Sequence, residues 1–224
     1  MKLYMHPAST VSRPVRLLIA EKGLKVDEEL VDILSGAHHQ EPYCSLNPNR
    51  MVPMLVDGDL KLTESSAILK YLADKFDLPE YPKDLGKRAK VNEAMDWFMS
   101  NFYKDWGYNL VYPQLFPHHK RGSDEAHEGA IRWGVEKSAN WLKLLDTHWL
   151  GDGRKYLTGD QITIADYLAA CVLAVGDIIR FDLSAYPNVK AWHARMKALP
   201  HWAEISTVAQ GFADSVKDKP FVIS

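Results

Sequence analysis

Two short segments hold side chains whose types and spacing could bind and activate a small charged molecule. The first contains three hydroxyl groups, on Ser9, Thr10 and Ser12, followed by Pro14. Proline is favoured in the first turn of a helix, where unpaired backbone N–H groups and the helix dipole favour a nearby anion. Ser12 lies closest to this predicted helix start, so its hydroxyl is the best placed to stabilise an anion. The alternative is that Ser12 only caps the helix.

The second segment covers residues 52–68 and predicts a strand, a hairpin turn, a second strand and a helix. Asp57-Gly58 forms the two-residue turn, and Glu64-Ser65 opens the apolar-periodic helix that follows. Ser65 and the first amides of that helix suit a carboxylate, whereas Glu64 suits an ammonium group. A free amino acid carries both groups. The same residues could equally be an ordinary helix cap.

The Val52-Pro53 pair followed by Glu64-Ser65 resembles the signature of the thioredoxin-like half of the cytosolic glutathione transferases. The resemblance implies that glutathione is the co-substrate. It also implies a cis peptide bond between Val52 and Pro53, which turns the preceding backbone towards the cysteinyl part of glutathione.

The serine-type members of this family, notably the theta and delta classes, carry their active serine two residues before a proline. Ser12-Arg13-Pro14 matches that frame, and the chain resembles bacterial theta-like members most. The resemblance therefore implies that Ser12 stabilises the glutathione thiolate; the other two hydroxyl residues of the turn do not fit the frame. Other classes use a tyrosine, but Tyr4 is expected to be a strand residue that faces the core. The turn has no cysteine, which argues against thiol transferase activity.

Further glutathione contacts follow from the same resemblance. His39 matches a theta-class histidine that reaches the glycyl carboxylate, with His38 as the alternative. Arg50 stands where the family pattern has a glycine, and Met51 where it has a lysine or glutamine. A guanidinium matches a carboxylate well, so Arg50 can replace the missing side-chain contact. The predicted glutathione-binding residues are Ser12, His39, Arg50, Val52, Pro53, Glu64 and Ser65.

A dense aromatic stretch over residues 102–116 predicts the pocket for the second substrate, a small apolar electrophile. Aromatic side chains interrupted by a few polar groups are typical of a concave ligand site. Trp106 and Tyr112 are the preferred pocket residues, together with Tyr103 and Phe116. His118 and His119 follow directly, but adjacent histidines on a loop make a poor zinc site, so this run is interpreted as solvated and no metal is expected.

The distribution of strand and helix patterns predicts two domains. Residues 1–80 alternate short strands (2–6 and 28–33) with helical stretches, as in an α/β thioredoxin-like domain that binds glutathione. Residues 76–86 contain two prolines and predict the linker. Residues 87–224 predict an all-α domain that holds the electrophile site, because every periodic segment there is helical. The helices are predicted over 87–103, 123–145, 163–178 and 186–199, with Thr163 and Asp166 as a capping box.

Composition narrows the class of protein. The 224 residues carry a formal net charge of −2 and are 46% hydrophobic, which gives no electrostatic footprint for nucleic acid or a membrane surface. No apolar run is long enough to span a bilayer. Cys44 and Cys171 form no C-x-x-C motif and match no disulfide framework, so a reducing cytoplasm is the expected location.

The function expected from these patterns is a glutathione transferase that conjugates or dehalogenates its electrophile, working as a homodimer. Two alternatives stay open at this stage. One is a non-catalytic scaffold or ligand-binding protein of the same architecture. The other is a glutathione-dependent isomerase or peroxidase of the same fold.

Overall fold

A computed structural model describes residues 1–223 of the chain. Its first domain is built on a mixed four-stranded sheet in the order β2-β1-β3-β4. β1 pairs with β2 in parallel and with β3 antiparallel, and β3 and β4 form a hairpin around Gly58, whose φ is 60°. The strands are β1 (Lys2–Met5), β2 (Asp27–Leu30), β3 (Met54–Asp57) and β4 (Leu60–Thr63).

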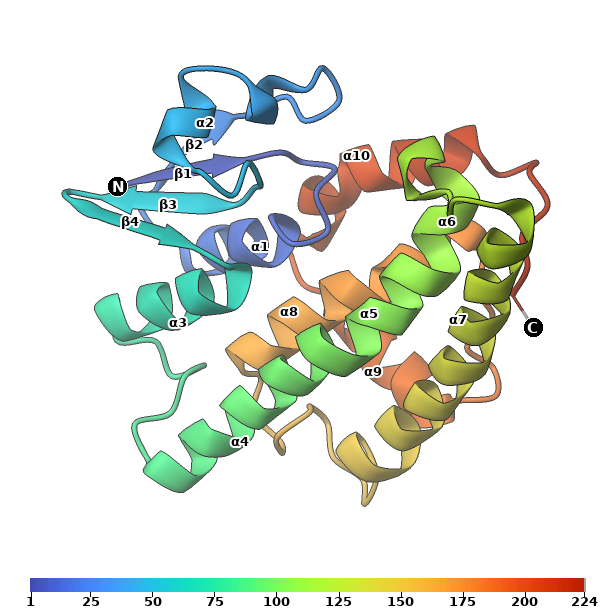
Figure 1. Ribbon diagram of the computed structural model, residues 1–224. Coiled ribbons are helices and arrows are strands. Elements are labelled where there is room, and N and C mark those ends of the chain that lie inside the picture. The colour runs from blue at the N-terminus through green and yellow to red at the C-terminus, as the bar shows by residue number, and fades with distance from the viewer. Residues whose placement is uncertain (224) are drawn as a thin grey trace.

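Helices cover both faces of this sheet. α1 (Arg13–Lys22) and α3 (Ser65–Lys75) lie on the face towards the second domain, and the short α2 (Tyr43–Leu46) lies on the other (Figure 1). α1 ends at Gly23 in the left-handed conformation, as its sequence predicts. Leu3 and Leu55 are fully buried on the α1 and α3 side, so the larger core of this domain lies between the sheet and the second domain.

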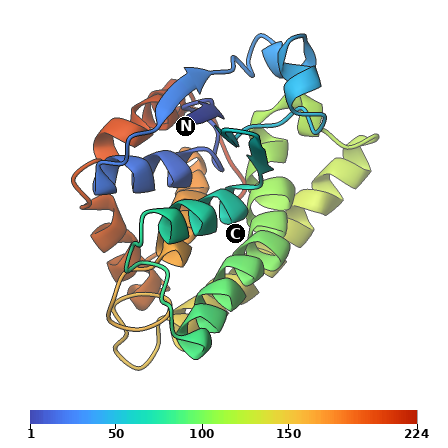
Figure 2. The same cartoon turned by 90° about the vertical axis from the view of Figure 1, so that its left-hand side faces the viewer.

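The second domain, as described to residue 223, is built of helices joined by loops. Its central helix is α8 (Ile164–Leu173), in which all ten residues are buried. Figures 1 and 2 show this domain packed alongside the first. The helix over residues 202–215 was not predicted. The remaining α-helices are α4 (Leu85–Trp97), α5 (Tyr103–Asp105), α6 (Tyr112–Leu115), α7 (Asp124–Leu144), α9 (Pro187–Lys197) and α10 (Trp202–Ser215).

The helical run from α4 to α6 contains two π-helical segments, Phe98–Phe102 and Trp106–Val111. These wider turns join α4, α5 and α6 into one continuous but irregular helical run, which is called the α4–α6 rod below. A π-helical insertion changes which side chains share a face, and it occurs often at functional sites.

The predicted capping box at the start of α8 is confirmed. The Asp166 carboxylate accepts hydrogen bonds from the backbone N–H groups of Thr163 (2.8 Å) and Leu157 (3.0 Å) and from Trp192 Nε1 (3.0 Å). One buried side chain therefore ties three segments of the helical domain together.

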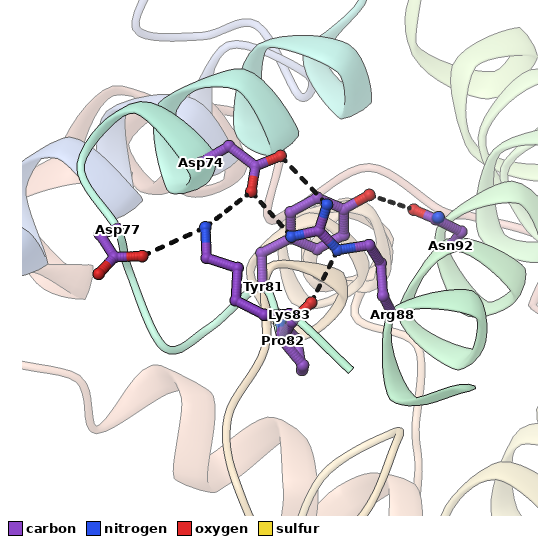
Figure 3. Close-up of polar contacts among 7 residues, drawn as sticks. All are labelled: Asp74, Asp77, Tyr81, Pro82, Lys83, Arg88 and Asn92. Atoms are coloured by element: carbon purple, nitrogen blue, oxygen red, sulfur yellow. Dashed lines mark hydrogen bonds and ion pairs between the residues drawn. The ribbon is translucent and has the colours of Figure 1, made fainter. Parts of the chain in front are cut away.

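The predicted linker is held by polar contacts (Figure 3). Arg88 donates from Nη2 to Asp74 Oδ1 (2.8 Å) and from Nε to the carbonyl of Pro82 (2.7 Å). Tyr81 Oη donates to Asn92 Oδ1 (3.0 Å). The end of α3, the linker and the start of α4 thus form a single hydrogen-bonded unit.

Direct hydrogen bonds also join the two domains. The guanidinium of buried Arg13 donates from Nη2 to the carbonyl of Cys171 (3.1 Å), and the backbone N–H of His201 donates to Glu21 Oε1 (2.7 Å). α1 therefore contacts both α8 and α10. Over residues 1–223, none of the helices has the length and apolar character needed to cross a membrane.

Candidate active site

Strand register brings the predicted glutathione-binding segments to one edge of the sheet. Met54 of β3 is paired with Thr63 of β4 and with Tyr4 of β1. Pro53 and Glu64, one residue beyond this pairing, therefore lie side by side. The chain leaving β1 enters the turn before α1 at the same edge. Residues separated by more than fifty positions in the sequence thus meet around the start of α3.

The entry to α3 is open for an anion. Glu64 occupies the N-cap position with φ 64° and ψ 116°, and its side chain makes no capping hydrogen bond. Its side chain is exposed, while Ser65 is 3% exposed. A non-glycine residue with positive φ costs conformational energy and is concentrated at functional sites. The first amides of α3 therefore face a position where a carboxylate can bind, next to an exposed carboxylate that suits an ammonium group.

The peptide bond between Val52 and Pro53 is cis, as the resemblance implied. Two side chains hold the loop that precedes this bond by hydrogen bonds to one carbonyl group. Asn47 Nδ2 donates to the carbonyl of Met51 (2.7 Å), and Tyr43 Oη donates to the same oxygen (2.6 Å). These two hydrogen bonds fix the backbone that approaches the site.

The residues predicted to reach the glycyl carboxylate lie on exposed turns. Arg50 has φ 54°, a backbone conformation that glycine adopts most easily, and its side chain is exposed. His39 is also exposed, at the end of the turn Ala37–His39, and its ring lies 3.9 Å from that of half-buried His38. Both positions leave a cationic or hydrogen-bonding group free for a ligand.

The turn before α1 places Ser9 and Ser12 in different surroundings. Ser12 is fully buried, caps nothing, and has no hydrogen-bond partner for Oγ within residues 1–223. Ser12 occupies the N-cap position of α1 without a side-chain cap hydrogen bond. Ser9 Oγ accepts the N–H of Ser12 (3.2 Å), and the Ser9 carbonyl accepts the N–H of Arg13 (3.1 Å). Since Ser9 Oγ accepts that hydrogen bond, its own hydrogen is free to be donated. Ser9 is 9% exposed. The burial of Ser12 argues against its predicted contact with the sulfur and favours Ser9.

Two of the predicted pocket residues meet this turn. Thr10 Oγ1 lies 2.7 Å from Tyr112 Oη, which lies 2.6 Å from Tyr103 Oη. Burial raises the pKa of Tyr112 to about 12 and holds that of Tyr103 well above its ordinary value. Both phenols therefore keep their hydrogens at neutral pH.

Trp106 does not line a pocket, contrary to its prediction. It is 1% exposed, donates from Nε1 to the carbonyl of Leu173 (3.2 Å), and packs edge-on against Phe181 at 4.8 Å. A Cβ on Gly176 would lie 2.1 Å from its ring. Trp106 is a core residue between the α4–α6 rod and the segment after α8.

His119 belongs to the aromatic cluster, although the sequence interpretation placed it in a solvated run. It is half-buried, and its ring lies 5.3 Å from Tyr112 and 6.1 Å from Phe116. Burial lowers the pKa of His119. Half-buried Phe116 stacks on Phe212 of α10 at 5.5 Å, so the unpredicted helix also contributes to this cluster. No local pattern distinguishes His119 from its exposed neighbour His118.

Tyr4 is a strand residue, but it faces the α2 side of the sheet rather than the larger core. Its ring lies 5.8 Å from Tyr43. A cavity of about 570 Å³ lies on this face and is lined in part by Tyr4, Leu46 and Lys61. None of the predicted glutathione-binding residues lines it, so this cavity is not the candidate site.

Comparison with known proteins identifies the family. Models of the glutathione S-transferase N-terminal and C-terminal domains match residues 1–74 and 113–200. Human glutathione S-transferase theta-2B is 31% identical over 201 residues, which cover 88% of this chain and 81% of that protein. The chain belongs to the glutathione S-transferase family.

Solved glutathione transferase structures agree with this assignment. A delta-class glutathione transferase of Nilaparvata lugens is 32% identical with a TM-score of 0.81, covering 96% of this chain and 98% of its own. Human glutathione transferase theta-2, in complex with glutathione and an unknown ligand, is 28% identical with a TM-score of 0.85, covering 99% and 92%. The predicted glutathione transferase architecture, a thioredoxin-like domain followed by an all-helical domain, is confirmed.

Proposed function

We propose that this protein is a glutathione transferase that binds glutathione at the sheet edge formed by β1, β3 and the start of α3. The observation that carries the proposal is the convergence of the Val52–Pro53 cis bond, exposed Glu64 and the uncapped start of α3. Glu64 binds the glutamyl ammonium group, and Ser65 with the amides of α3 binds the glutamyl carboxylate. The backbone of Val52 binds the cysteinyl part.

Arg50 and His39 are proposed to hold the glycyl carboxylate, at the other end of the tripeptide. Both side chains are exposed on turns next to the loop that leads to the cis bond. Arg50 brings a fixed positive charge that can form two parallel hydrogen bonds to a carboxylate.

The hydroxyl that stabilises the thiolate is assigned here to Ser9 rather than Ser12. A cysteinyl thiol with a pKa near 8.5 is about 3% ionised at pH 7, and lowering that pKa by about two units requires roughly 2.7 kcal/mol of differential stabilisation. One charge-assisted hydrogen bond and the start of a helix can supply about that amount. Ser9 has a free hydrogen and some exposed surface, whereas Ser12 has no exposed surface.

Ionisation alone gives a small acceleration, because nucleophilicity falls as the thiol becomes more acidic. Most of the rate must come from holding the electrophile against the sulfur. The aromatic cluster of Tyr103, Tyr112, Phe116 and His119 is the proposed site for it, since Tyr112 is joined to the turn that contains Ser9. The reaction is conjugation or halide displacement on a small apolar electrophile.

A homodimer is also proposed, because large apolar side chains stay exposed on the single chain. Leu85 is 82%, Met51 57% and Trp133 51% exposed. Sedimentation should give a species of about twice the 25.4 kDa chain mass, and a 25.4 kDa species at micromolar concentration would refute the dimer.

Cys44 and Cys171 are both free thiols, which suits the cytoplasmic location expected from the sequence.

Calorimetric titration with glutathione tests the function directly. The protein should bind one glutathione per chain, and S-methylglutathione should compete for the same site. Absence of binding up to millimolar glutathione would refute the proposal and favour a non-catalytic scaffold.

A further inference from the structure

Three hydroxyl groups from two domains form a continuous hydrogen-bonded chain at the proposed electrophile site. Thr10 comes from the turn before α1, Tyr103 begins α5, and Tyr112 begins α6. The two oxygen–oxygen distances are 2.7 Å for Thr10 to Tyr112 and 2.6 Å for Tyr112 to Tyr103. Both are within the normal range for hydroxyl hydrogen bonds. These three residues are called the hydroxyl relay below.

A count of hydrogens shows that the relay has one left to donate. Each of the three hydroxyls carries a single hydrogen. Two hydrogens are used in the two contacts inside the relay, so one remains for an outside acceptor whichever way the bonds point. Tyr103 is 6% and Tyr112 8% exposed, whereas Thr10 is only half-buried. Thr10 is therefore the end from which the spare hydrogen can reach a bound molecule.

Local backbone geometry is arranged to bring the two phenols together. Residues nine positions apart lie about half a turn from each other on a regular α-helix, on opposite faces. The π-helical segment between them, Trp106–Val111, has wider turns and so brings the two side chains to the same face. A Cβ on Gly107 would lie 2.6 Å from the Tyr103 ring and 3.3 Å from that of Tyr112, so both rings pack where only glycine fits.

We propose that Thr10, backed by Tyr112 and Tyr103, donates a hydrogen bond to an oxygen of the electrophile, which directs the enzyme towards substrates on whose oxygen negative charge develops. Epoxides and conjugated enones are such substrates. This inference rests on the proposed function, since it needs glutathione to be bound beside Ser9.

The step balances without any further reactant. The glutathione thiol first releases its proton to solvent. For an epoxide, the thiolate then forms the carbon–sulfur bond as the carbon–oxygen bond breaks, and the electron pair remains on the oxygen. Thr10 donates its hydrogen bond, and then its proton, to this oxygen. Proton transfer along the relay and from solvent restores Thr10. With an alkyl halide the electron pair leaves on the halide, which is a much weaker hydrogen-bond acceptor.

Two electrophiles with the same phenyl ring separate these cases: styrene oxide and benzyl chloride. Thr10→Val and Tyr112→Phe should each lower the ratio of kcat/KM for styrene oxide to kcat/KM for benzyl chloride by about 10- to 100-fold, because only the epoxide develops charge on oxygen. Thr10→Ser should restore most of the lost epoxide activity. Tyr81→Phe is the matched control, since it also removes a hydrogen-bonded hydroxyl from a buried tyrosine, but at the linker.

An equal loss with both substrates would show that the relay only supports packing between the domains, and would overturn the proposal. A raised thiolate pKa of bound glutathione in Thr10→Val would overturn it too, by assigning Thr10 to the sulfur. Wild-type enzyme that is active on benzyl chloride but inactive on styrene oxide would contradict the substrate class alone. Absence of glutathione binding would instead refute the proposed function itself.

Discussion

The glutathione-binding end and the electrophile-binding end of the candidate site differ in the groups that form them. The glutathione end combines backbone features, namely the Val52–Pro53 bond, the positive φ of Glu64 and the open amides of α3, with exposed side chains on the same segments. The electrophile end consists of side-chain rings from α5, α6 and α10, joined to the first domain through Thr10. Backbone features arise from local sequence, whereas a cluster of rings depends on how distant helices pack. The first end should therefore tolerate changes in the helical domain, and the second should not.

The largest effect is expected from Asp166, which holds the helical domain together. Asp166→Ala leaves four donors without their acceptor: the backbone N–H groups of Leu157 and Thr163, the Thr163 hydroxyl and Trp192 Nε1. The free energy of unfolding should fall by about 3 to 5 kcal/mol, because each buried donor left unpaired costs about 1 to 3 kcal/mol. Urea denaturation measures this change. Asp124→Ala, at an exposed helix start, is the control and should change stability by less than about 1 kcal/mol.

Protonation of His193 at acid pH should lower the free energy of unfolding of the helical domain. Burial lowers the pKa of His193 from 6.5 to about 4. A histidine with a lowered folded-state pKa takes up its proton more readily when unfolded, so its contribution is lost as the pH falls from about 6.5 to 4. The loss should be about 2 to 3 kcal/mol. His193→Gln should flatten this part of the stability profile. An unchanged profile in His193→Gln would contradict the assignment.

The glutathione end should respond to loss of a single charge. Glu64→Ala removes the partner of the glutamyl ammonium group and should weaken glutathione binding by about 1 to 3 kcal/mol. The same variant should leave urea stability nearly unchanged, because the Glu64 side chain is exposed. Calorimetry measures the affinity, and Glu204→Ala on the outside of α10 is the control. Equal affinities in wild type and Glu64→Ala would place the ammonium group elsewhere.

The smallest effect is expected from Arg50, where conformation and charge act in opposite directions. Arg50→Gly relieves the cost of a non-glycine residue at φ 54° and should raise the free energy of unfolding by a few tenths to about 1 kcal/mol. It also removes the guanidinium, so glutathione should bind more weakly, by about 1 kcal/mol. A more stable protein with lower affinity is the expected combination. Unchanged affinity would leave His39 as the residue that holds the glycyl carboxylate.

Sequence patterns predicted the features that depend on neighbouring residues. The hairpin at Gly58, the end of α1 at Gly23 and the capping box of Thr163 and Asp166 each rest on a few adjacent positions. The two-domain architecture followed from where strand periodicity stops. α10 was missed, because it mixes small and polar residues with a glycine inside the helix, Gly211, which weakens its helical signal.

Features that depend on three-dimensional packing were predicted less well. The density of aromatic residues did not show which rings face a site, because the π-helical segments change the faces that side chains share. Trp106 was therefore placed in the pocket and His119 in solvent. The distance from Pro14 along the chain predicts Ser12 as the thiolate hydroxyl. Its burial and the partial exposure of Ser9 depend on how the turn packs, which that distance does not show.

The ultraviolet absorbance of the thiolate in the enzyme–glutathione complex, followed as a function of pH, tests the assignment of the thiolate hydroxyl most directly. In Ser9→Ala the pKa of the bound thiol should rise by about one to two units, equivalent to roughly 1.4 to 2.7 kcal/mol, because the donor to the sulfur is lost. In Ser12→Ala the titration should match that of the wild type, since Ser12 has no exposed surface. A raised pKa in Ser12→Ala together with an unmoved titration in Ser9→Ala would contradict the account and return the role to Ser12.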